Sequence, residues 1–117
     1  MKFEELCDAR YSLRKFDSRP VEAEKLQKVL EAGRKAPTAH NLQPQRFFVM
    51  QSEEALAKAD TCTACHFHPP VVIVAAYDPE IAWKREEDGK NHGEIDVTLA
   101  VSQMMLQAAE LGLGTTY

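Results

Sequence analysis

Apolar residues recur at helical spacing in two long stretches of the chain. In residues 21–35 the apolar face follows the i, i+3, i+4, i+7 pattern and consists of Leu26, Val29, Leu30 and Gly33. Pro37 ends this predicted helix, because the residue before a proline avoids the helical region. Residues 94–111 are apolar around most of a helix circumference, which indicates a central helix or one buried in a subunit interface. Gly112 follows as a left-handed C-cap.

Two shorter apolar runs have the pattern of β-strands. The first is RFFVM at 46–50, and the second is VVIVAAY at 71–77. Because the second run is continuously apolar and rich in β-branched residues, it predicts a strand buried on both faces. Short helices are expected over 3–9 and over 53–60, where Ser52 supplies the cap. This order of elements predicts an α+β or α/β sandwich in which helices pack on a small sheet.

Length and charge narrow the class of protein. The 117-residue chain suits one modest domain, which we expect to cover residues 1–117. Its formal net charge of −4 argues against nucleic-acid binding, because phosphate-binding surfaces usually make a domain basic. No apolar run approaches the ~20 residues of a membrane span, and the first ten residues are charged where a signal peptide would be apolar. With an odd number of cysteines as well, we expect a cytoplasmic protein with free thiols that binds neither nucleic acid nor membrane.

The segment ARYSLRKFD alternates along its length. If its backbone is extended, Arg10, Ser12 and Arg14 point to one side, and Tyr11 and Leu13 point to the other. Two guanidiniums and a hydroxyl on one side can converge on a single anion, and the forked donors of arginine suit phosphate. The alternative is a solvated strand face, because a short motif of this kind also arises by chance.

A second polar segment, APTAHNLQPQ, lies between the predicted helix and the first strand. Thr38, Asn41 and Gln43 offer hydrogen-bond donors and acceptors. Pro37 and Pro44 restrict the loop, which lowers the entropic cost of binding a ligand. The alternative is ordinary turn chemistry, since asparagine and proline are common in turns.

The stretch CTACHFH matches several known patterns at once. Cys62, Cys65 and His66 fit c-type haem attachment, and with His68 they could form a zinc or thiol redox site. Haem attachment requires an exported context, zinc sites usually combine two separated ligand pairs, and redox CxxC motifs follow a strand rather than a helix. We therefore expect an incidental surface loop without a metal, and a metal-binding or thiol redox module is the alternative function.

No nucleophile–base pair stands out, since all four histidines lie in predicted loops. If the protein is an enzyme, a bound cofactor therefore carries the chemistry. Taken together, the segments resemble the nitroreductase family of FMN-dependent oxidoreductases over almost the whole chain. The matching stretches are ARYSLRKF, APTAHNLQPQRFFV, PPVVIVAAYD and DGKNHGEIDVTLAVSQMMLQAAELGLGTTY.

The resemblance implies a fold and a cofactor site. The fold would be α+β, a sandwich of helices on a small mixed β-sheet, with the central buried helix in the interface of a homodimer. FMN would bind at that interface, with Arg10 at the phosphate, Arg14 near N1 and O2 of the flavin, and Ser12 beside them. The partner subunit would line the flavin with Pro37, Thr38, Asn41 and Gln43.

The resemblance also implies an activity. NAD(P)H would be the co-substrate, and hydride would pass through flavin N5 to an electron-poor acceptor such as a nitroaromatic or quinone, without a catalytic side chain. Family members extend well beyond position 117, with further strands and a segment that completes the phosphate site. We therefore expect this chain to correspond to the N-terminal portion of the fold, and a non-catalytic flavin-binding remnant is a further alternative.

Overall fold

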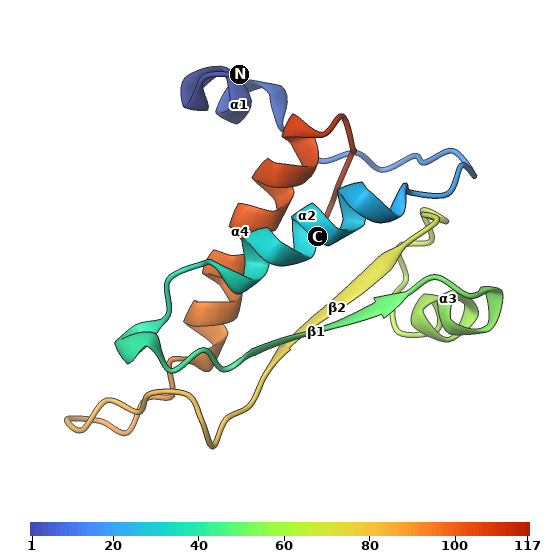
Figure 1. Cartoon of the computed structure of the whole chain (residues 1–117). Helices are drawn as coiled ribbons and strands as arrows, with labels where there is room; N and C mark the ends of the chain where they lie inside the picture. Colours follow the sequence, from blue (N-terminus) through green and yellow to red (C-terminus); the bar gives the residue numbers. More distant parts are fainter.

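Two long helices pack together beside a small sheet (Figure 1). The computed structural model describes all 117 residues. Helix α2 (Ala23–Arg34) packs on α4 (Gly93–Glu110), and α4 contacts both strands of the sheet. The core between them contains Val29 of α2 and Met104 and Ala108 of α4, and Phe47 and Ile73 of the sheet pack against it. The predicted α+β class, with helices on a small sheet, is confirmed.

Helix α4 has one face buried in the core and another left open. The buried face repeats every fourth residue and consists of Asp96, Ala100, Met104 and Ala108. On the other side, Ile95 and Leu99 are exposed apolar residues. The predicted central helix is therefore confirmed, and its place in a subunit interface stays a prediction.

The sheet is antiparallel and has two strands, β1 (Gln45–Met50) and β2 (Val72–Tyr77). Their register runs from Gln45 opposite Tyr77 to Met50 opposite Val72. Phe48 and Val74 face each other on the side away from the core and are 54% and 41% exposed. The prediction that residues 71–77 are buried on both faces is therefore wrong for this chain, because one face of the strand pair packs on the core and the face with Val74 stays open.

A parallel β-bridge joins the two ends of the chain. Ser12 pairs with Thr115, and the Leu13 amide donates to the Thr115 carbonyl at 2.9 Å. The predicted extended segment ARYSLRKFD is thus reduced to one bridge rather than a strand. Gly112, at φ +79°, ends α4 as predicted, because the Leu113 amide reaches back to the Ala108 carbonyl at 2.8 Å. The Ser12–Thr115 bridge is parallel, whereas the two strands of the sheet pair antiparallel.

The remaining helices are short and lie where the sequence predicts them. Helix α1 covers Phe3–Ala9 and α3 covers Glu53–Asp60. The Ser52 hydroxyl caps α3 by accepting the Ala55 amide at 3.1 Å. No helix has both the length and the apolar character that a membrane crossing requires.

Candidate functional site

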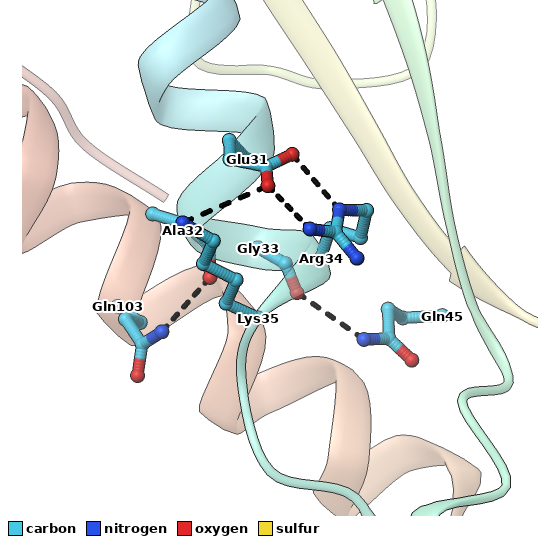
Figure 2. A network of polar contacts seen from close by, with 7 residues as sticks. All are labelled: Glu31, Ala32, Gly33, Arg34, Lys35, Gln45 and Gln103. Atoms are coloured by element: carbon cyan, nitrogen blue, oxygen red, sulfur yellow. Dashed lines mark hydrogen bonds and ion pairs between the residues drawn. The ribbon is translucent and has the colours of Figure 1, made fainter.

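The polar loop, residues 36–44, begins where α2 ends against its neighbours (Figure 2). A helix end leaves its last carbonyls without partners inside the helix. Here the Gln103 amide donates to the Ala32 carbonyl at 2.9 Å, and the buried Gln45 amide donates to the Gly33 carbonyl at 3.2 Å. The end of α2 is therefore tied to both α4 and β1, which defines where the polar loop starts.

Charged residues on the last turn of α2 form a separate surface group. Glu31 pairs with Arg34 and, at 3.7 Å, with Lys35 (Figure 2). The hydrogen bond from Arg34 holds the pKa of the Glu31 carboxyl below its usual value of 4.5. Positive side chains at the C-terminus of a helix also interact favourably with its dipole.

The backbone of the polar loop is strained. His40, Asn41 and Gln43 have φ values of 55°, 54° and 54°, in the left-handed region that residues other than glycine rarely adopt. Ala39–Asn41 form a single 3-10 turn, η1. The Thr38 hydroxyl accepts the Gln43 amide at 3.0 Å and so closes the loop on itself. Such conformations persist only where the surroundings hold them.

The polar loop rests on the segment that leads into α4. The Ala39 amide donates to the Asp96 carboxylate at 3.0 Å. The His40 ring lies on the Trp83 ring with centroids 4.9 Å apart, and Trp83 in turn meets His92 edge-on at 4.6 Å. At the end of the loop, the carbonyl of the buried Pro44 accepts the Asp78 amide at 2.9 Å.

The predicted ligand-facing residues of the polar loop lie together on its surface. Pro37, Asn41 and Gln43 are exposed, and Thr38 is half-buried because its hydroxyl is used inside the loop. The side-chain amide of Gln43 donates to the main-chain carbonyl of Asn41 at 3.3 Å, within the loop. The structure therefore brings all four residues into one short turn, in which the exposed residues Asn41 and Gln43 lie close together.

The arginine segment, residues 10–16, differs in how its side chains are used. Arg14 is exposed, Arg10 and Ser12 are half-buried, and neither of the two guanidiniums has a hydrogen-bond or ion-pair partner in the chain. The other four arginines do have acceptors, which are Asp17 for Arg19, Glu31 for Arg34, main-chain carbonyls for Arg46 and Asp88 for Arg85. Arg10 and Arg14 are thus the arginines left free to bind an external anion.

The arginine segment and the polar loop lie at opposite ends of the molecule (Figure 1). The polar loop is bonded to the first turns of α4 through Asp96, whereas Ser12 pairs with Thr115 just beyond the last turn. From Asp96 to Glu110, the last residue of α4, the helix advances 14 residues, which separates these points by about 21 Å at 1.5 Å per residue. One chain therefore presents two halves of the predicted site that do not meet.

The CTACHFH stretch forms an exposed loop after α3. Cys62 and Cys65 are free and exposed, as is Cys7. His66 pairs with Asp60 through Nδ1 at 2.7 Å. No group of three or more histidine, cysteine, aspartate or glutamate side chains is arranged to hold a metal ion.

Asp96 and the aromatic group around Trp83 were missed by the sequence analysis. Asp96 occupies the same four-residue spacing as the buried positions Ala100, Met104 and Ala108, so it is an acid on a core-facing stripe. That spacing was the available signal for Asp96. No sequence pattern indicates the contact between the His40 and Trp83 rings, because that contact depends on how two loops fold.

Comparison with known proteins agrees with this architecture. The profile of the Nitroreductase family matches residues 8–67 and 63–117. A nitroreductase family protein of Clostridium difficile 630 is 44% identical, with a TM-score of 0.93 over 97% of this chain and 66% of its own. An FMN-dependent nitroreductase of Clostridium difficile R20291 is 35% identical, with a TM-score of 0.78 over 93% of this chain and 61% of its own.

A curated relative leads to the same family. An NADPH-dependent oxidoreductase of Staphylococcus epidermidis is 27% identical over 97% of this chain and 51% of its own length. The chain therefore spans about half to two-thirds of the length of these relatives. With a profile match along nearly all of its residues and a matching fold, this chain belongs to the nitroreductase family.

Proposed function

We propose that the protein is a cytoplasmic FMN-dependent oxidoreductase that uses NAD(P)H to reduce an electron-poor acceptor such as a nitroaromatic or a quinone. The observation that carries the proposal is the free state of Arg10 and Arg14 in a chain whose other arginines are all engaged. Free guanidiniums suit a phosphate, and FMN carries one. The relatives named above include an FMN-dependent nitroreductase and an NADPH-dependent oxidoreductase, which supports the same chemistry.

Each part of the proposed site has a distinct task. Arg10 binds the phosphate, and Ser12 adds a hydroxyl donor beside it. Arg14 would supply a positive charge near N1 and O2 of the ring, which would stabilise the anionic reduced form. Bound FMN supplies hydride acceptor and donor chemistry at N5, so no side chain acts as a nucleophile. The rigid polar loop orients the ring and keeps water away from it.

The site requires two copies of the chain. Because one chain holds the arginine segment and the polar loop at opposite ends of α4, a two-fold dimer can place the polar loop of one copy against the arginine segment of the other. Pro37, Thr38, Asn41 and Gln43 would then come from the partner. The exposed Ile95 and Leu99 on α4 offer apolar surface for such an interface.

A titration of purified protein with FMN tests the proposal. Replacing Arg10 or Arg14 with alanine should raise the Kd for FMN by roughly 10- to 100-fold, since a hydrogen bond to a charged group contributes about 1.5–3 kcal/mol. Arg19→Ala is the matched control, because that guanidinium is already paired with Asp17 on the surface. Equal effects of all three substitutions would contradict the assignment.

Oxidation of NADPH or NADH with a nitroaromatic or quinone acceptor tests the second half of the proposal. Turnover that depends on bound FMN is expected. Protein that binds FMN but oxidises neither nucleotide would instead be a non-catalytic flavin-binding remnant. Protein that binds stoichiometric zinc and no flavin would favour the module built on Cys62, Cys65, His66 and His68.

A further inference from the structure

Asp96 is the one ionisable side chain buried in the core. It is 2% exposed, on the face of α4 that packs inward. Its Oδ1 accepts the Ala39 amide at 3.0 Å, and its Oδ2 is buried without a partner. A buried carboxylate is unfavourable unless its hydrogen bonds compensate, and here there is only one. Packing alone therefore does not account for an acid at this position.

The partner of Asp96 lies at the start of the strained part of the polar loop. Ala39 is followed by His40, Asn41 and Gln43, all in the left-handed region. The bond between Thr38 and Gln43 lies within the loop and cannot orient the loop as a whole. The exposed Arg46 of β1 donates to the Gln43 carbonyl at the end of the loop. The Ala39–Asp96 hydrogen bond is thus the one that ties the backbone of residues 37–43 to a buried side chain.

The Ala39–Asp96 hydrogen bond favours one conformation of the polar loop. With the Ala39 amide held, the following turn exposes Asn41 and Gln43 together. A loop released from this tie would relax toward ordinary backbone conformations, because left-handed residues other than glycine are unfavourable. Binding a ligand would then have to restore the strained turn, which weakens affinity.

We propose that Asp96 is a positioning residue, which holds the polar loop in the conformation that contacts the flavin. The inference rests on the proposed function for its ligand, while the effect on the loop itself is independent of any ligand. Asp96 does not contact the flavin. It acts through the Ala39 amide, and the strain of the turn is balanced by the hydrogen bond to Asp96 inside the core.

Two substitutions remove the same hydrogen bond from opposite sides. Asp96→Ala removes the acceptor. Ala39→Pro removes the donor, and proline fits there because Thr38 is extended and residue 39 is the first of a short helical turn. Asp96→Asn keeps a carbonyl oxygen in the same place and is the rescue variant. Ala23→Pro, at the first position of α2, is the control for introducing proline.

The first readout is amide hydrogen exchange of Asn41 and Gln43, measured without FMN. Both amides donate to Thr38, to its carbonyl at 2.9 Å and its hydroxyl at 3.0 Å, so their protection reports the closed turn. Asp96→Ala and Ala39→Pro should accelerate this exchange, while Asp96→Asn and Ala23→Pro should leave it close to wild type. Unchanged exchange in both Asp96→Ala and Ala39→Pro would overturn the proposal.

The second readout is the Kd for FMN in a double-mutant cycle. Asp96→Ala and Ala39→Pro should each weaken binding by about tenfold, a size typical of coupling between two sites, and the double variant should be no weaker than either. Additive effects would contradict a shared hydrogen bond. If Asp96→Ala fails to fold, Ala39→Pro and Asp96→Asn still decide the outcome. If wild type binds no FMN but exchange accelerates as expected, the proposed function fails and the positioning role stands.

Discussion

The two halves of the proposed flavin site are held in opposite ways. The polar loop is tied at its start by the end of α2, in its middle by Asp96 and Trp83, and at its end by Pro44. The arginine segment has one isolated bridge, between Ser12 and Thr115, and two guanidiniums without partners. The polar loop is thus held at several points, whereas we expect the arginine segment to gain order if it binds the proposed phosphate. In the proposed site, the polar loop would select the shape of the ligand and the arginine segment would recognise its charge.

A substitution at Gly33, next to the start of the polar loop, should have the largest effect on the stability of the fold. Gly33 lies where α2 meets its neighbours, and a Cβ added there would come within 2.6 Å of the Met104 sulfur and 2.9 Å of the Phe47 ring. Gly33→Val should therefore destabilise the fold by about 1–3 kcal/mol, as overpacked cores do. Thermal unfolding checks this, with the exposed Lys28→Ala on the same helix as control. Equal melting temperatures for the two variants would show that the core around Gly33 accommodates a larger side chain.

Mixing two variants tests whether the halves come from different copies. Arg14→Ala and Asn41→Ala should each weaken FMN binding, because each removes one side of the pocket. After the two are unfolded together and refolded, half of the dimers should be mixed, and each mixed dimer should carry one intact site. About a quarter of the wild-type FMN sites should then return. No recovery would mean that both halves serve the same copy.

Hydrogen exchange should separate the two regions without any ligand. The Leu13 amide, bonded to Thr115 in an isolated bridge, should exchange faster than the amides of β1. Saturating FMN should slow the exchange of Leu13 more than that of Gln43, because the arginine segment has more order to gain. Equal protection of Leu13 and β1 in the free protein would remove the contrast between the regions.

The smallest effect is expected at the surface group beside the polar loop. Arg34 lowers the pKa of Glu31, so the pair stabilises the fold above the ordinary glutamate value of 4.5 and this contribution is lost as the pH falls through the lowered pKa. Glu31→Gln should therefore flatten the decline in stability below about pH 4.5 only slightly, since exposed pairs contribute little. Denaturant unfolding at pH 3.5 and pH 7 measures it. A large change at pH 7 would reveal a stronger role for this pair.

Much of the fold could be predicted because its signals are local. Helical spacing in α2, the Ser52 cap and the glycine that ends α4 each depend on a few neighbouring residues, and each prediction is confirmed. The burial of β2 could not be read in the same way. Its apolar run predicts two covered faces, but which faces are covered depends on neighbouring elements, and Val74 is exposed in this chain.

The candidate site shows the same difference between local signals and contacts that form only on folding. Arg10, Arg14, Asn41 and Gln43 are recognisable from residue type and spacing, and their roles toward FMN stay predictions. Asp96 and Trp83 act on the polar loop from positions more than 40 residues away, so no local pattern links them to it. The residues expected to touch a ligand form a recognisable motif in the sequence. The residues that shape the loop can be identified only in the folded structure, because they are far from the loop in the sequence.

The free edge of β2 has a practical consequence for anyone who handles the protein. Val72–Tyr77 contains no charge and no proline, and one side of its backbone has no strand beside it. Open edges of this kind are templates for strand addition by other chains, and proteins usually blunt them with lysine, proline or a covering element. Concentrated solutions should therefore form open-ended aggregates through this edge, distinct from any closed two-fold dimer. Val74→Lys, on the exposed face, should suppress this aggregation without disturbing the core.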